Sequence, residues 1–370
     1  MAFKFFSKKE KEEKKKKGPV REWVDAITFA VVAATLIRWA FMEAFTIPTS
    51  SMENSLLVGD FLFVSKINYG PRTPKTPLQI PLTHQKIWGT DISSYLDWIQ
   101  LPQYRLPGFD DVERNDVVVF NYPKENHPVD LKTHYIKRCV AIPGDVIEVV
   151  NNQVFINGEK GENPERMQFH YLINTKDNQS IRDRVFEDQN ISEFNQYSKP
   201  SGGYQYAAFM TPKSAEIIKS FDFVTDVEII PPNIDDQYQI FPNAPGNNWN
   251  RDYYGPLKIP GEGLTFQMDS ANVAHYGSTI QLYEGYEKDA VKISNNTLTI
   301  NGEVVTEYTF KQNYYFMMGD NRHNSADSRY WGFVPENHVV GEAAFIWLSL
   351  DYKKSLFSKV RWGRIFNGID

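Results

Sequence analysis

A charged run followed at once by an apolar segment is the feature that most constrains how this chain can fold. Residues 8–17 are almost entirely charged and rich in lysine, and residues 26–45 are predominantly apolar. Arg38 interrupts the apolar segment and leaves a charge-free run of twelve residues, Ala26 to Ile37. A membrane span needs roughly 20 apolar residues, so the segment can cross a bilayer only if Arg38 reaches outward to the interface.

This order of charge and apolarity predicts a transmembrane helix over residues 22–45, after a basic cytoplasmic N-terminus at 1–21. Trp23 and Trp39 lie sixteen residues apart, about 24 Å along a helix, and match the two interfaces. The rest of the chain is then expected outside the cytoplasm. A cleaved signal peptide needs a small-x-small site, which residues 40–44 do not supply well. A buried helix of a soluble protein is the other alternative.

The composition indicates a globular protein with no general affinity for nucleic acid. Of the 370 residues 41% are hydrophobic and 14% aromatic, enough for one large or two ordinary domains. The net charge of -6 makes nucleic acid a poor first hypothesis for a partner. A single cysteine, Cys139, excludes an internal disulfide and a multi-cysteine metal site.

Alternating apolar residues predict a mainly β, largely antiparallel fold after the apolar segment. The clearest strands are expected at 61–67, 116–122 and 135–150, the last interrupted by a turn at 143–145. Residues 343–350 are too few for a second membrane span and are predicted to form a buried strand.

Two segments share apolar alternation, an Asn-Asn step and a terminal Asn-Gly. Residues 147–159 read IEVVNNQVFINGE and residues 291–303 read VKISNNTLTINGE, which predicts two hairpins. The two hairpins are either related to each other or independent segments that contain the same common turn residues. The segment between them, 160–289, is rich in Asn, Pro, Gly and Tyr, with a helical pattern only near 214–221, and is expected to be an inserted second domain.

A polar block and two isolated residues are the candidates for chemistry. Residues 318–332 read MGDNRHNSADSRYWG, a density of polar and charged side chains that is typical of the surroundings of an active site. A serine becomes nucleophilic when a base takes its proton, and a lysine can serve if burial lowers its pKa. Lys137, in an apolar strand pattern, and Ser51, after Pro48, are candidates. By themselves, however, they also fit an ion-paired lysine and a serine in a turn.

Four motifs in order resemble those of bacterial type I signal peptidase. Residues 47–60 read IPTSSMENSLLVGD, and 114–120 read RNDVVVF. A third motif, 135–145, reads YIKRCVAIPGD, and the fourth lies within the polar block, continued to Val334. The family serine that acts as nucleophile corresponds to Ser51, and the family lysine to Lys137. The motifs cover the apolar segment and about half of the chain.

The resemblance implies an enzyme that uses a serine and a lysine to form an acyl-enzyme. Ser51 attacks the scissile carbonyl and Lys137 acts as the general base, then passes the proton to the leaving amine. The Ser51 backbone N–H and the Thr49 hydroxyl are the expected oxyanion hole. Ser325 corresponds to the family serine that hydrogen-bonds the lysine amine.

Two carboxylates of the polar block correspond to family residues that pair with arginines. Asp320 and Asp327 are expected to pair with Arg138 and Arg329 and to hold the site together. For Asp327 and Arg329 a purely structural salt bridge is the favoured interpretation.

The chain departs from the family pattern at three places. Ser50 stands where glycine is usual, Asn54-Ser55 where Pro-Thr is usual, and His323 where aspartate is usual. His323 and His134 are alternative bases, but because the lysine position is intact both are expected to lie at the surface or to have hydrogen-bonded structural roles. We find no metal-ligand spacing and expect no cofactor and no metal.

The resemblance implies a signal-peptidase/LexA-like catalytic fold that removes signal peptides from secretory preproteins after Ala-x-Ala-like sites. The expected location is the outer face of the bacterial cytoplasmic membrane, with contact to membrane lipid. A LexA-like self-cleaving regulator is an alternative, as is an inactive membrane-tethered binding protein on the same fold. The expected parts are the N-terminus 1–21, transmembrane helix 22–45, catalytic domain 46–159 (with an aromatic-rich insertion at 70–108) and 290–350, inserted domain 160–289, and basic tail 351–370.

Overall fold

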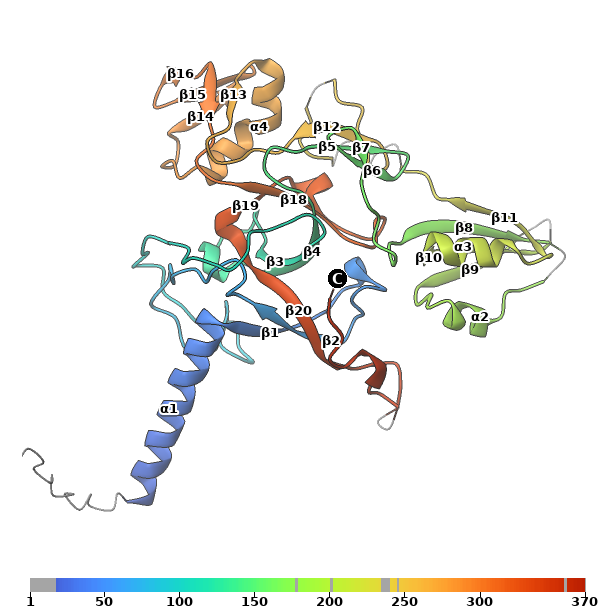
Figure 1. Ribbon diagram of the computed structural model, residues 1–370, viewed down its shortest axis with the longest axis horizontal. Coiled ribbons are helices and arrows are strands. Elements are labelled where there is room, and N and C mark those ends of the chain that lie inside the picture. Colours follow the sequence, from blue (N-terminus) through green and yellow to red (C-terminus); the bar gives the residue numbers. More distant parts are fainter. Residues whose placement is uncertain are drawn as a thin grey trace, which may run out of the picture.

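The N-terminal helix stands apart from the body of the protein (Figure 1). The computed structural model describes residues 18–176, 179–199, 202–233, 240–244, 246–355 and 358–369. Helix α1 covers Pro19–Ala40 and buries none of its residues. Within these described ranges it is the single helix long and apolar enough to cross a membrane. The charged run at 8–17 lies outside the described residues.

The helix is shorter than the expected span of 22–45. It ends at Ala40, and the next residues form strand β1, Met42–Thr46, because their backbone groups pair with strand β2. Arg38, which we expected to reach the membrane interface, instead forms an ion pair of 2.6 Å with Glu43. Trp39 donates a hydrogen bond of 2.7 Å to the Arg72 carbonyl. The last turn of α1 is therefore attached to the body of the protein.

A seven-stranded antiparallel sheet is the centre of the fold and confirms the mainly β prediction. Its order is β1-β2-β20-β3-β4-β18-β19, so the late strand β20 lies between two early ones. One face covers an apolar core that includes Met52, Leu62 and Val119. The other strands are β2 (Asp60–Ser65), β3 (Val117–Asn121), β4 (His134–Ala141), β18 (Tyr314–Met318), β19 (Val334–Pro335) and β20 (Val339–Ser349), which match the strands expected at 61–67, 116–122 and 343–350.

A second region is built around the two predicted hairpins and one helix. In both hairpins the Asn-Asn and Asn-Gly steps have positive φ, for example 49° and 70° at Asn151 and Asn152, as two-residue hairpin turns require. Helix α4 (Ser270–Tyr283) shares one core with them. The strands are β5 (Val146–Val150), β6 (Gln153–Ile156), β7 (Glu159–Lys160), β12 (Tyr254–Lys258), β13 (Thr265–Gln267), β14 (Val291–Ser294), β15 (Thr297–Ile300), β16 (Glu303–Val304) and β17 (Glu307–Thr309).

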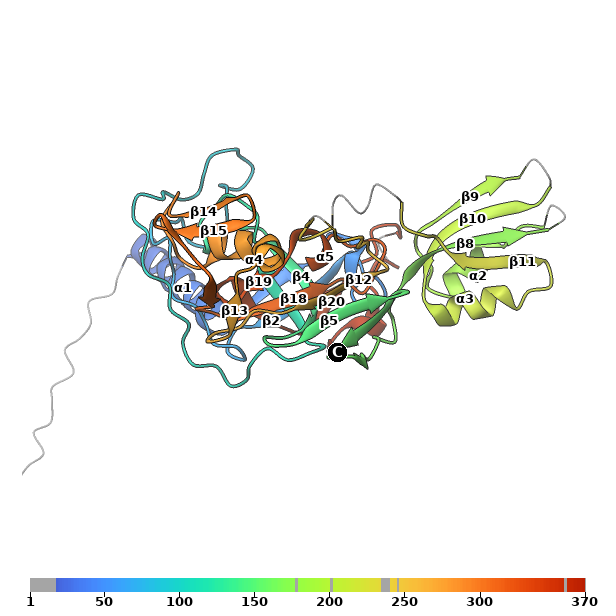
Figure 2. The ribbon, with the colours of Figure 1, turned by 90° about the horizontal axis from the view of Figure 1, so that it is seen from above.

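A third, four-stranded sheet lies at the end of the molecule opposite α1 (Figures 1 and 2). Its order is β11-β8-β10-β9, and it has its own core around Ile173, Phe186 and Tyr206. We call this unit the distal sheet. It contains β8 (Phe169–Thr175), α2 (Asp183–Asp188), β9 (Phe194–Ser198), β10 (Tyr204–Met210), α3 (Pro212–Lys219) and β11 (Val224–Ile229).

The segment 160–289 thus contributes to two cores, since α4 and β12 pack with the hairpins rather than with the distal sheet. Its bounds as one domain stay a prediction. The helix expected near 214–221 is confirmed as α3. The insertion 70–108 contains isolated β-bridges, such as the one between Arg72 and Arg105. Its residues, all of them described, form no extended strand and no helix.

The described part of the tail packs against the seven-stranded sheet. It contains a short 3-10 helix, η5 (Trp362–Arg364), and Arg364 contacts both carboxylate oxygens of the buried Asp60 at 3.1 and 2.6 Å. At least one of its cations is therefore engaged within the protein rather than in solvent. Phe357 lies outside the described residues.

Candidate active site

The nucleophile candidate lies on a short 3-10 helix that follows β1. Thr49 has extended backbone and precedes η1, Ser50–Met52. Met52 is fully buried and fixes this turn in the core. The Ser51 carbonyl accepts a hydrogen bond of 3.1 Å from the Asn321 N–H, which ties the turn to the polar block. Thr49 itself is exposed, two residues before Ser51.

Lys137 lies beside Ser51 although 86 residues separate them in the chain. Its Nζ is 2.7 Å from Ser51 Oγ and donates to the Ile136 carbonyl at 2.9 Å. The residue is 4% exposed. Burial lowers the pKa of Lys137 to about 8, against the opposing effect of Asp327 and Asp320. A substantial fraction of the amine is therefore neutral near pH 8 and able to accept a proton from the serine.

Ser325 lies near the dyad but does not make the expected bond. Its hydroxyl is buried and has no hydrogen-bond partner among the described residues. The expected contact with the Lys137 amine is therefore absent from this arrangement of the site. Gly319 separates Ser325 from the nucleophile turn: a Cβ on Gly319 would lie 2.3 Å from Ser325 Oγ and 2.5 Å from the Ser51 carbonyl oxygen.

The structure brings together both expected arginine–carboxylate pairs. Arg138 bonds Asp320 through two contacts of 2.9 and 2.7 Å, and both side chains are buried. Asp320 also accepts from the Ser55 hydroxyl at 2.6 Å. The third guanidinium nitrogen of Arg138 donates to the Asn115 carbonyl. This pair links strand β4, which carries Lys137, to the polar block.

The second pair joins Asp327 and Arg329 at 2.9 and 2.8 Å, with both fully enclosed. Burial alone would raise the pKa of Asp327, but Arg329 and the Gly319 and Arg329 backbone N–H groups hold it below its usual range. Arg329 also donates to the carbonyls of Arg251 and Arg322. The pair therefore joins separate parts of the chain, in keeping with the structural role we favoured for it.

Two asparagines of the polar block hold the nucleophile turn, a role that the sequence did not assign. The Asn321 side chain donates to the Ser50 carbonyl at 3.2 Å. Asn324 donates to the Ser50 hydroxyl at 3.0 Å and to Glu193 of the distal sheet at 3.1 Å. The polar block pointed to this region, but nothing near Glu193 in the sequence identifies it.

Neither histidine considered as a base contacts Ser51. His323 lies 2.8 Å from Asp252 and 3.0 Å from Asn152, and its side chain is fully buried. His134, the first residue of β4, packs against Phe45 with tilted rings whose centroids are 4.9 Å apart, three positions before Lys137. Burial lowers the pKa of both histidines.

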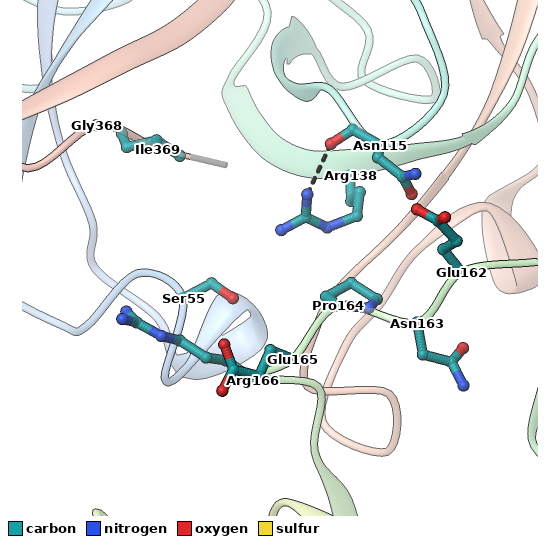
Figure 3. A pocket seen from close by; sticks show the side chains of 10 residues that line it. All are labelled: Ser55, Asn115, Arg138, Glu162, Asn163, Pro164, Glu165, Arg166, Gly368 and Ile369. Atoms are coloured by element: carbon teal, nitrogen blue, oxygen red, sulfur yellow. Dashed lines mark hydrogen bonds between the residues drawn. The ribbon is translucent and has the colours of Figure 1, made fainter.

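Two cavities lie near the site. The smaller, about 340 Å³, adjoins the Arg138–Asp320 pair rather than the dyad (Figure 3). The larger, about 840 Å³, lies beside the last turns of α1. In the described ranges no three His, Cys, Asp or Glu side chains are grouped so that they could hold a metal ion. The smaller cavity is lined by Ser55, Asn115, Arg138, Glu162, Asn163, Pro164, Glu165, Arg166, Gly368 and Ile369.

Comparisons with known proteins identify the family. The family model for "Signal peptidase, peptidase S26" matches residues 20–205 and 307–348. Signal peptidase I of Buchnera aphidicola subsp. Schizaphis graminum is 27% identical over 328 residues, covering 89% of this chain and 74% of the relative. Signal peptidase I of Helicobacter pylori strain J99 is 25% identical, with 94% and 91% covered, and that of Rickettsia felis is 26% identical, with 89% and 79%. Since the family model matches more than half of the chain, the chain belongs to the signal peptidase family, peptidase S26.

Proposed function

We propose that this membrane-anchored serine endopeptidase removes signal peptides from secretory preproteins with Ser51 and Lys137 as its catalytic dyad. The observation that supports this most directly is the 2.7 Å contact between Ser51 Oγ and a lysine that is almost completely buried. Burial supplies what the chemistry needs, because a lysine in water is protonated at neutral pH and cannot act as a base.

The reaction proceeds in two halves. Ser51 Oγ attacks the scissile carbonyl carbon as its proton moves to Lys137 Nζ. The Ser51 N–H and the Thr49 hydroxyl donate to the oxyanion. Lys137 then gives the proton to the leaving amine, the C–N bond breaks, and an ester joins the signal peptide to Ser51. In the second half Lys137 takes a proton from water, whose oxygen attacks the ester carbonyl carbon. The ester C–O bond then breaks, Lys137 returns the proton to Ser51 Oγ, and the signal peptide leaves with a new carboxyl group.

The substrate is held as an extended strand between two unpaired edges. β1 is at one end of the seven-stranded sheet and pairs with β2 alone. Along His134–Lys137, β4 pairs with β3 on one side only. Its pairing with β18 on the other side begins at Arg138, so this stretch of β4 leaves one edge unpaired. The two edges face each other, since Phe45 of β1 contacts His134. An extended peptide there adds a strand, as in other β-augmentation complexes, and places its carbonyl at Ser51.

The topology suits a substrate that arrives from a membrane. α1 crosses the bacterial cytoplasmic membrane with the lysine-rich residues 8–17 inside, and the site lies outside. The insertion 70–108, next to α1, exposes Trp98 at 80%, and Phe109, just beyond it, is exposed at 81%. Such aromatic side chains partition into the lipid interface, so this segment rests on the membrane surface.

Cleavage of a preprotein with an Ala-x-Ala site tests the function. The full-length protein in detergent should cut after the second alanine, while folded Ser51→Ala and Lys137→Ala variants should not. Mass spectrometry of the products locates the cut. If all three proteins are folded and equally inactive, the chain is a binding protein on this fold. If Lys137→Ala retains its activity, the base is another residue.

A further inference from the structure

We propose that the larger cavity, about 840 Å³, binds the apolar part of the substrate that precedes the cleavage motif. This inference rests on the proposed function. It makes the insertion 70–108 a determinant of specificity, because that segment forms much of the cavity wall.

The cavity opens at the start of the groove between β1 and β4. Glu43 of β1 and His134 of β4 both line it. Four successive antiparallel pairings join β1 to β4, so the two strands run in the same direction, β1 toward the nucleophile turn and β4 to Lys137. Lys137 lies three positions after His134, about 10 Å along the strand at 3.3 Å per residue. An extended substrate whose last residue before the cut lies opposite Lys137 therefore reaches the cavity at about its fourth residue before the scissile bond, one residue before the first alanine of the Ala-x-Ala motif.

The charged groups around the cavity are already satisfied within the protein. Glu43 pairs with Lys66 at 2.7 Å and with Arg38 at 2.6 Å. Burial would raise the pKa of Glu43, but these cations hold it at about 2. Asp130 accepts hydrogen bonds from the backbone and hydroxyl of Thr76. A charged ligand would have to break these contacts, so none of these groups recruits one.

The remaining wall combines polar side chains, among them Gln79, His84 and Gln103, with a set of apolar ones. Leu36 and Trp39 come from the last turns of α1, and Ile80, Leu82 and Leu101 come from the insertion. The insertion is fixed to α1 by the bond from Trp39 to Arg72, and Thr73 N–H bonds the Tyr104 carbonyl at 2.8 Å to close its base. An apolar wall that begins at the end of a membrane helix suits a peptide whose apolar run leaves the bilayer beside that helix.

Two substrates distinguish this inference from the proposed function. One is a preprotein with its complete signal peptide, and the other is a short peptide that begins at the first alanine of the same Ala-x-Ala site. Only the first can enter the cavity. Ile80→Glu places a charge in the apolar wall; Ile80 is 46% exposed, so the fold tolerates the change. Ile99→Glu is the matched control, at 49% exposed in the same segment and outside the cavity lining.

Ile80→Glu should lower kcat/KM for the preprotein by about tenfold, mainly through KM, and leave the short peptide unchanged. Leu101→Glu, at 44% exposed, should do the same, and Ile99→Glu should change neither rate. Unchanged cleavage of the preprotein by both cavity variants would overturn the inference, as would an equal loss on both substrates. If the unmodified enzyme cuts neither substrate, the proposed function fails instead.

Discussion

Lys137 acquires its reactivity from the strand that carries it. The amine lies on β4 between a sheet core and the polar block, with two hydrogen-bonding partners, Ser51 and the Ile136 carbonyl. Burial makes the amine a base near neutral pH. It also destabilises the folded protein, because the charged ammonium is disfavoured in the buried site. A fall in pKa from 10.5 to about 8 corresponds to roughly 3 kcal/mol.

Lys137→Met should therefore raise the free energy of unfolding at pH 7, by up to about 3 kcal/mol, while abolishing activity. Below pH 8 the lysine is charged in both the folded and unfolded states, so its burial penalty is complete. From about pH 8 to 10.5 the folded protein holds a neutral amine and the penalty shrinks. Urea unfolding of both proteins at pH 7 and pH 10 measures the difference in their free energies of unfolding. A stability advantage of Lys137→Met that does not shrink between these pH values would contradict the burial penalty.

Thr49 offers a second test at this scale, because its hydroxyl is our expected oxyanion donor. Loss of one such donor typically lowers kcat by 10²- to 10³-fold, so Thr49→Val should do the same. Thr49→Ser keeps the hydroxyl and should stay near the unmodified rate. Steady-state cleavage of the short peptide is the measurement, and near-normal kcat for Thr49→Val would remove Thr49 from the mechanism.

At the scale of elements, the turn after β18 sets the position of the nucleophile. Gly319 follows β18 and passes close to both the Ser51 carbonyl and Ser325. The next residues bond across to the same turn through the Asn321 N–H. The close approach requires a residue without Cβ at 319, which explains glycine there without any need for positive φ.

Gly319→Ala should lower kcat by on the order of 100-fold, because the added Cβ must displace the Ser51 backbone by a substantial part of an ångström. Gly363→Ala is the control, since a Cβ there meets nothing within 4 Å. Circular dichroism and kcat on the short peptide separate misfolding from misplacement. A folded Gly319→Ala variant with normal kcat would show that the turn adapts.

The sequence predicted well those elements that are determined by the residues within them. The Asn-Gly and Asn-Asn turns required positive φ, and alternating apolar residues marked β2, β3 and β20. The end of α1 was predicted wrongly. The apolar residues of β1 resemble those of the helix before them, and only their pairing with β2 shows that they form a strand. The position of β20 between β2 and β3 depends on long-range pairing that no local pattern contains.

The candidate site shows the same division. The family motifs identified Ser51, Lys137 and the Arg138–Asp320 pair, and the structure places these together. The expected bond of Ser325 is absent, because hydroxyl contacts depend on rotamers that a motif does not specify. Glu193 could not be predicted, since its contact with Asn324 depends on how the distal sheet packs.

At the scale of the whole molecule, the distal sheet contributes to holding the active site. The backbone of Gln168, the residue directly before β8, pairs with residues 320–322 of the polar block. Ser192 bonds the buried Glu53, next to the nucleophile turn, at 2.9 Å. Glu193 and Ser50 share the Asn324 amide. The distal sheet at one end of the molecule and α1 at the other thus bracket a site whose turn contacts both the core and the distal sheet.

Glu193→Ala should lower kcat about three- to tenfold with little change in KM, because Asn324 loses the contact that orients its amide toward Ser50. Asn324→Ala should have a similar effect, and the double variant should be no worse than Asn324→Ala, since both remove one linkage. Glu187→Ala on the exposed face of α2 is the control. Additive losses in the double variant would show that the two residues act independently.

The central claim is that neutral Lys137 activates Ser51, and the pH dependence of kcat/KM tests it most directly. With a substrate that does not titrate, kcat/KM reports the free enzyme. It should rise about tenfold per pH unit below about pH 8 and level off above, because only the deprotonated amine accepts the serine proton. A rate that is independent of pH from 6 to 9, or that levels off near the ordinary histidine pKa of about 6.5, would contradict the assignment of Lys137 as the base.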